Sequence, residues 1–166
     1  MHVVVIGLSH HSSPVTVREK FAFAEAKIPA ALQTLRESGL AEEAVILSTC
    51  NRVEIYAATA LEPRRAFAEL QEFLVRFHDY REPITDELYQ FSDHDSIEHL
   101  FKVACGLDSM VLGETEILGQ LKKAYDLALQ HRHTKARLNK AFQRAFNVAK
   151  QIRTETGIQR DRKSVV

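Results

Sequence analysis

The stretch EAVILSTCNRVEIYAATA, residues 43–60, decides the fold. Its first part, EAVILSTC (43–50), is an apolar run typical of a strand. Its second part, RVEIYAATA (52–60), alternates polar and apolar side chains with the period of two that marks a strand with one buried face. Asn51 stands between the two parts, and asparagine is common in tight turns. The stretch therefore predicts a β-hairpin with a cysteine at its turn.

The segments on either side of this hairpin predict two more strands and several helices. HVVVIGLSH (2–10) reads as a buried strand, and ELYQFSD (87–93) reads as a shorter one. Apolar residues at helical spacing predict one or two helices within 16–39 and further helices at 63–80, at 96–107 and from about 117 to 130. This order predicts an α+β fold: a split βαβ, ferredoxin-like antiparallel sheet with helices on one face, followed by a long C-terminal helix.

The composition is that of a soluble globular chain. The 166 residues are 45% hydrophobic and 27% charged, and no apolar run approaches the ~20 residues that a membrane helix requires. The N-terminus lacks the basic segment and the long apolar run of a signal peptide, so we expect a cytoplasmic protein with no membrane partner. Two cysteines, Cys50 and Cys105, are too few for a disulfide framework and are expected as free thiols.

Charge divides the chain into two parts. Residues 1–130 hold 12 Lys and Arg against 20 Asp and Glu, whereas residues 131–166 hold 10 against 2. The basic part suits either a polyanion or a solvated helix face. It also carries a narrow apolar stripe at spacings of 4, 3, 4 and 3, formed by Leu138, Phe142, Ala145, Ala149 and Ile152. The stripe needs a partner surface, which is either the preceding domain or another one. Because GIQRDRKSVV (157–166) reads as the start of a linker, we expect a longer protein.

Cys50 is the residue whose surroundings favour chemistry. It lies in a polar run at a strand end, where Arg52 can favour the thiolate or bind a substrate carboxylate in a bidentate clamp. If the backbone ran straight, positions 50, 52 and 54 would share a face, although a turn at Asn51 would break that parity. The alternative is a cysteine that only packs, which is the interpretation we favour for Cys105.

Metal and nucleotide sites find little support in the sequence. A metal set of His10, His11, Cys50 and His99 can be imagined, but no HxH, HExxH or CxxC spacing supports it, so we expect no metal. The six glycines form neither GxGxxG nor GxxxxGK[ST], so a nucleotide cofactor would bind outside this segment. His99 lies on the edge of an apolar helix stripe, which is typical of a surface or boundary residue.

Four stretches together resemble one family. LSTCNRVEIY (47–56), GLDSMVLGETEILGQ (106–120), KAFQRAFNVAKQIRTET (140–156) and the opening GLSHHSSPVTVREKFAF (7–23) are similar to the N-terminal catalytic domain of glutamyl-tRNA reductase. The resemblance covers essentially the whole chain. It implies a cysteine that attacks the ester joining glutamate to tRNA and forms a thioester. Hydride from NADPH then releases glutamate-1-semialdehyde, which begins tetrapyrrole (porphyrin and haem) synthesis by the five-carbon route.

The resemblance also assigns roles to residues. Cys50 matches the nucleophile, and His99 matches a histidine important for activity. The residues that would line the glutamate pocket are Thr49, Asn51, Arg52, Ser109, Glu114, Thr115, Glu116 and Gln120. Arg52 suits the side-chain carboxylate of the substrate. Glu116 stands where the family often has Gln, so it either contacts the substrate ammonium or faces solvent.

The resemblance divides the chain into a catalytic α+β domain at 1–130 and a long basic linker segment at 131–166. The second part would begin a "spinal" helix and the linker to an NADPH-binding domain that, like the dimerisation domain, is missing here. The expected partners are glutamyl-tRNA, a second copy of the full-length enzyme in a homodimer, and a next-enzyme or regulatory protein. Two alternatives stay open: a non-catalytic module that binds tRNA or a protein, and a structural fragment whose apolar stripe recruits a partner helix.

Overall fold

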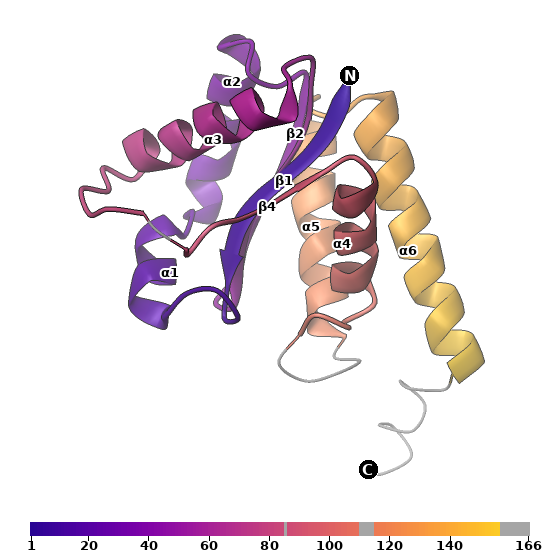
Figure 1. Cartoon of the computed structure of the whole chain (residues 1–166). Helices are drawn as coiled ribbons and strands as arrows, with labels where there is room; N and C mark the ends of the chain where they lie inside the picture. Colours follow the sequence, from indigo (N-terminus) through magenta and orange to yellow (C-terminus); the bar gives the residue numbers. More distant parts are fainter. Residues whose placement is uncertain (85, 110–114, 157–166) are drawn as a thin grey trace.

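The computed structural model describes residues 1–84, 86–109 and 115–156. The elements, shown in Figure 1, are β1 (His2–Ser9), α1 (Val15–Phe21), the 3-10 turn η1 (Glu25–Lys27), α2 (Ile28–Glu37), β2 (Glu43–Ser48), β3 (Arg52–Thr59), α3 (Pro63–Phe77), β4 (Tyr89–Ser92), α4 (His94–Ala104), α5 (Glu116–Gln130) and α6 (Ala136–Thr156). This is the order of strands and helices that the sequence predicts, including the three helices after β4. In the described part of the chain, no helix is both long enough and apolar enough to cross a membrane.

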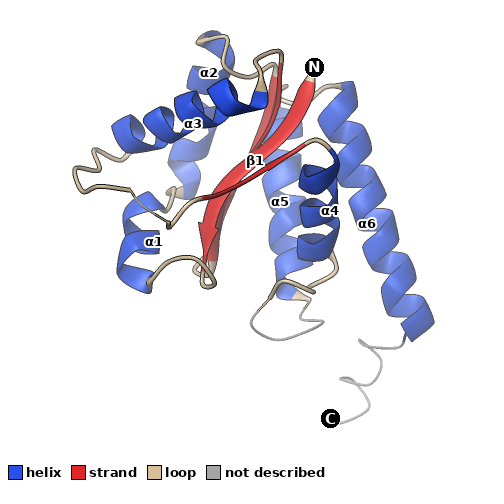
Figure 2. Ribbon diagram, in the orientation of Figure 1, coloured by secondary structure: helices blue, strands red, loops and turns tan. Residues whose placement is uncertain are grey.

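The strands of the described residues form one antiparallel sheet in the order β2-β3-β1-β4 (Figure 2). β2 and β3 are the predicted hairpin, with Ser48 opposite Val53 beside the turn. β1 lies between β3 and β4 and pairs with both, so Gly7 is opposite Glu54 on one side and Tyr89 on the other. The centre of the sheet therefore aligns residues from three distant parts of the sequence.

Helices cover both faces of this sheet, so the prediction of helices on one face is wrong. α2 and α3 pack on one face, and α4, α5 and α6 pack on the other (Figure 1). Every residue of β3 is consequently buried, including Arg52 and Glu54. The polar residues that produce the period of two face α4 and α6 instead of water. Glu54 accepts a hydrogen bond from His99 of α4, and the Tyr56 ring contacts Phe142 of α6.

α6 packs on the rest of the chain along the predicted apolar stripe. The fully buried members of the stripe are Leu138, Phe142, Ala145 and Ala149. The Phe142 ring lies 5.3 Å, between centroids, from Tyr56 of β3 and 5.3 Å from Tyr125 of α5. Of the two partners that the sequence left open for this stripe, the structure shows the preceding domain.

Glu43, the first residue of β2, fixes the start of α6. Its Oε1 accepts hydrogen bonds from the backbone N–H groups of Lys135 at 2.5 Å and Leu138 at 2.9 Å. The Ala44 N–H beside it donates to the His133 carbonyl at 2.9 Å. Because the first N–H groups of a helix have no partner within the helix, a distant carboxylate supplies the cap here.

Candidate active site

The turn between β2 and β3 presents Cys50 to solvent. Cys50 is exposed, whereas Cys105 at the end of α4 is buried, and burial raises the pKa of the Cys105 thiol. Thr49 holds the turn: its N–H donates to the Arg52 carbonyl at 2.8 Å, and its Oγ1 accepts from the N–H groups of Asn51 and Arg52, each at 3.1 Å. These bonds fix the backbone on both sides of Cys50, so the two residues predicted beside it, Thr49 and Asn51, shape the turn that exposes the thiol.

The segment after β1 braces the same turn and brings a second cation to it. The His10 N–H donates to the Asn51 carbonyl at 3.0 Å, and Arg18 Nε donates to the Cys50 carbonyl at 3.3 Å. Arg18 also donates through Nη1 to the Ser13 carbonyl at 2.6 Å. Arg18 could not be found from a local sequence pattern, because its approach to the turn depends on the path of the chain after β1.

Arg52 is buried and already paired with two carboxylates of the same chain. Its Nη1 lies 3.3 Å from Glu54 Oε2, and its Nη2 lies 2.9 Å from Asp108 Oδ2 and 2.8 Å from the Asp108 carbonyl. Burial alone lowers the pKa of a guanidinium, but the neighbouring Glu54 raises the pKa of Arg52 above its ordinary value. The guanidinium therefore stays charged, and Asp108 stands where the sequence predicts a substrate carboxylate.

Glu54 is the centre of a buried network on this face of β3. Tyr56 donates to its Oε1 at 2.7 Å, Tyr89 donates to its Oε2 at 2.6 Å, and His99 Nε2 is hydrogen-bonded to the same Oε2. Burial alone raises the pKa of Glu54, but the hydrogen bond and charge of His99 together with Arg52 lower it to about 2. The carboxylate is therefore ionised at neutral pH, and each of these neighbours acts as a donor to it.

His99 is an interior residue and not the boundary residue that its place on the helix stripe indicates. Its side chain is 8% exposed, and its ring stacks on Phe91 of β4 with centroids 4.7 Å apart. Because an ionised carboxylate can only accept, Nε2 carries the proton in the bond to Glu54. The ring is thus fixed both by stacking and by this bond.

Gly7 makes room for the network. A Cβ at this position would lie 2.5 Å from the Val53 carbonyl oxygen and 2.8 Å from Glu54 Cγ. Tyr89 on β4 reaches Glu54 on β3 across β1, and Gly7 is the residue of β1 that lies between them. A glycine inside a strand often marks such a close approach. Gly7 in the first predicted strand is therefore the sequence signal that could have indicated this network.

The other predicted pocket residues are Ser109, Glu114, Thr115, Glu116 and Gln120, of which Glu114 lies outside the described residues. Ser109 directly follows Asp108, whose carbonyl accepts a hydrogen bond from Arg52 Nη2. Thr115 and Glu116 stand at the beginning of α5. Figure 1 places the beginning of α5 at the same end of the sheet as the β2–β3 turn. The part of these four described residues in a pocket with Cys50 stays a prediction.

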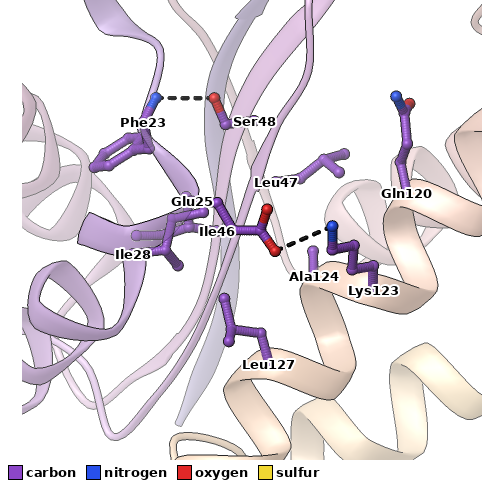
Figure 3. A pocket seen from close by; sticks show the side chains of 10 residues that line it. All are labelled: Phe23, Glu25, Ile28, Ile46, Leu47, Ser48, Gln120, Lys123, Ala124 and Leu127. Atoms are coloured by element: carbon purple, nitrogen blue, oxygen red, sulfur yellow. Dashed lines mark hydrogen bonds and ion pairs between the residues drawn. The ribbon is translucent and has the colours of Figure 1, made fainter.

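A pocket of about 200 Å³ lies along the edge strand β2, next to this turn (Figure 3). Gln120 borders it from α5, and Ser48, two residues before Cys50, borders it from β2. Glu25 and Lys123 form an ion pair of 3.0 Å across it. Gln120 therefore faces a cavity, although on the side of β2 and not in the buried Arg52 network.

Within the described residues, one group offers ligand atoms for a metal within 4.8 Å of one another, formed by the exposed His94, Asp95 and Glu98. This group begins α4 beside Asp93, whose N–H donates to the Val3 carbonyl at 2.6 Å. It therefore lies near the start of β1, at the opposite end of the sheet from the Cys50 turn. Exposed acidic groups of this kind are common without a metal.

Comparisons with known proteins agree with the resemblance in the sequence. The family described as glutamyl-tRNAGlu reductase, N-terminal domain, matches residues 6–156. A glutamyl-tRNA reductase of Pelotomaculum thermopropionicum is 45% identical over 99% of this chain, and one of Neisseria gonorrhoeae is 44% identical over 95% of it. The solved structure of glutamyl-tRNA reductase from Methanopyrus kandleri is similar with a TM-score of 0.77 and 35% identity, over 92% of this chain and 34% of that one. The chain spans 37% of the length of the two curated relatives.

Proposed function

The chain belongs to the family of glutamyl-tRNA reductase N-terminal domains, and from this premise we propose that it performs the acyl-transfer half of that enzyme's reaction. Cys50 takes the glutamyl group from glutamyl-tRNA as a thioester. The observation that carries the proposal is an exposed thiol on a hydrogen-bonded turn, two residues from a buried and permanently charged arginine.

The reaction at Cys50 balances as a simple acyl transfer. The thiolate attacks the carbonyl carbon of the aminoacyl ester, a bond from Sγ to carbon forms, and the bond from carbon to the ribose oxygen of the tRNA breaks. The proton of the thiol ends on that ribose oxygen. An aminoacyl ester is already activated, so the attack needs no strong acid at the leaving group. A thioester is in turn electrophilic enough to accept a hydride.

The reduction belongs to the longer protein. The glycines of this chain form no dinucleotide-binding loop, so its residues do not fit NADPH. The part of the reaction that this chain performs therefore ends at the thioester. In the full-length enzyme a hydride from NADPH, held by another domain, gives glutamate-1-semialdehyde for tetrapyrrole synthesis. The full-length enzyme is proposed to be a cytoplasmic homodimer that also meets the next enzyme or a regulatory protein.

The predicted pocket residues act as binding groups in this proposal. Arg52 faces the side-chain carboxylate of the substrate, and His99, fixed by Glu54, orients the substrate or assists proton transfer. The remaining binding residues are Thr49, Asn51, Ser109, Glu114, Thr115, Glu116 and Gln120. A site that pairs both a carboxylate and an ammonium rejects substrates that lack either group, because its own polar groups are then left unpaired.

Mass spectrometry tests the acyl transfer. After mixing with glutamyl-tRNA, the chain is expected to gain one glutamyl group at Cys50, and Cys50→Ser is expected to abolish both the adduct and the ester cleavage. Cys105→Ser is the matched control, because Cys105 is buried, and it should keep the adduct. An unmodified Cys50 together with unchanged ester cleavage by Cys50→Ser would refute the proposal.

A basic face on α6 favours a second candidate function, a module that binds RNA without catalysis. Arg137, Lys140 and Arg144 are exposed and lie at helical positions i, i+3 and i+7 of one face. Binding through phosphates predicts an affinity for tRNA that falls steeply with salt and does not change in Cys50→Ser. The same face also suits the tRNA of the first candidate, so the adduct at Cys50 decides between the two.

A further inference from the structure

We propose that Asp108 occupies, in the free chain, the place on Arg52 that the side-chain carboxylate of the substrate takes, and that this internal carboxylate must leave for the glutamyl group to bind. The proposal deepens the proposed function, since it concerns how the same site recognises glutamate. It makes Asp108 a specificity-determining residue through competition for one guanidinium.

The two carboxylates on Arg52 differ in how firmly they are held. Glu54 is fully buried and accepts from two tyrosines and His99 as well as from Arg52. The Asp108 side chain is 30% exposed, and its ion-pair partners among the described residues are Arg52 at 2.9 Å and the exposed His11 at 3.9 Å. Asp108 is therefore the carboxylate that can exchange with one from solvent.

The two carboxylates that already pair with Arg52 make this exchange of carboxylates necessary. Arg52 already faces two carboxylates, and Glu54 remains ionised at neutral pH. A third carboxylate at the same guanidinium would add a like charge within a few ångströms, in a site where Arg52 is 2% exposed and little water screens the repulsion. The substrate carboxylate can bind Arg52 only where that of Asp108 has moved away.

The position of Arg52 makes the exchange relevant to Cys50. The Arg52 N–H and carbonyl close the turn through Thr49, so the residue that carries the guanidinium is fixed two positions after Cys50. A carboxylate of the aspartate type and the side-chain carboxylate of glutamate are the same chemical group. Removing the charge of Asp108 should consequently strengthen the binding of a glutamyl ligand instead of weakening it.

Binding of the α-amide of L-glutamate, measured by NMR titration, tests the proposal. This probe keeps the side-chain carboxylate but has no ester, so it cannot acylate Cys50, and its binding is read independently of the proposed function. In Asp108→Asn the dissociation constant is expected to fall about fivefold, the size of one partly exposed ion pair. L-Alaninamide lacks the carboxylate and does not displace Asp108. Its NMR titration is expected to be the same for Asp108→Asn as for the unchanged chain.

Two further variants keep the test decisive. Asp79→Asn removes an aspartate that pairs with Arg81 at 3.3 Å on the surface, and it should leave binding of the glutamate amide unchanged. Asp108→Ser replaces Asp108→Asn where thermal unfolding shows that the latter is not folded. Equal, weaker or undetectable binding of the glutamate amide to the folded Asp108 variant overturns the proposal, as does a parallel gain for L-alaninamide.

Discussion

Glu54 keeps a negative charge out of contact with water because Tyr56, Tyr89, His99 and Arg52 surround it with donors. Its folded pKa of about 2 lies below the ordinary value of 4.5. A lowered carboxyl pKa contributes stability that is complete above the ordinary value and is lost as the pH falls toward 2. Glu54→Gln should therefore lower the free energy of unfolding by about 3–5 kcal/mol at pH 7, and by less at pH 3, as measured by urea titration.

The control for this prediction is Glu98→Gln. Glu98 pairs with Lys102 at 3.1 Å on the exposed face of α4, so its change should cost no more than about 1 kcal/mol at either pH. An equal loss of stability for Glu54→Gln at pH 7 and pH 3 would contradict the low pKa.

Gly7 tests the same network from the side of the backbone. In Gly7→Ala the new Cβ meets the Val53 carbonyl oxygen at 2.5 Å, and backbone atoms cannot move aside cheaply. We expect a loss of about 1–3 kcal/mol in the free energy of unfolding, as for other overpacked cores. Gly119→Ala on α5 is the matched control, because nothing lies within 4 Å of its Cβ. There the alanine should stabilise the helix by up to about 1 kcal/mol.

At the scale of elements, the cap that Glu43 of β2 provides connects the sheet to the start of α6. Glu43→Ala leaves the N–H groups of Lys135 and Leu138 without their acceptor, and we expect it to lower the free energy of unfolding by about 1–3 kcal/mol. Glu42→Ala, an exposed neighbour, should change it by less than about 0.5 kcal/mol. Equal effects of the two changes in chemical denaturation would show that Glu43 is not a cap.

The elements were predictable where a local pattern carries them. The β2–β3 hairpin, the place of Cys50 at its turn and the apolar stripe of α6 each follow from residues near one another in sequence. The second covered face of the sheet was not predictable, because a polar residue buried in a hydrogen-bonded network has the same period of two as a solvated one. Arg52 and Glu54 therefore read as a polar surface and are interior.

The site was predictable only in part for a related reason. The resemblance named Cys50, Arg52 and His99, but it gave no sign that Arg52 is already paired with Asp108. Nor did it show the alignment of Glu54, Gly7 and Tyr89, since that alignment requires β1 to lie between β3 and β4. Strand order is a property of the whole sheet, and single stretches of sequence do not encode it locally.

At the scale of the whole molecule, the position of α6 bears on the expected division at residues 130 and 131. Phe142 is fully buried between Tyr56 of β3 and Tyr125 of α5, so the basic helix shares its core with the sheet. Phe142→Ala should lower the free energy of unfolding by about 3–5 kcal/mol. If the sheet and α6 unfold as one unit, native-state hydrogen exchange should show the same loss of protection in both.

Two amides make that measurement specific. Those of Ala145 in α6 and Ile55 in β3 should lose equal protection in Phe142→Ala, because global unfolding sets the exchange of both. Arg144 is an exposed neighbour, and Arg144→Ala should leave the protection of both amides unchanged. A loss confined to Ala145 would mean that the segment from residue 131 opens separately from the sheet and the helices that precede it. In that case a partner that displaces α6 could act without unfolding the sheet that carries Cys50.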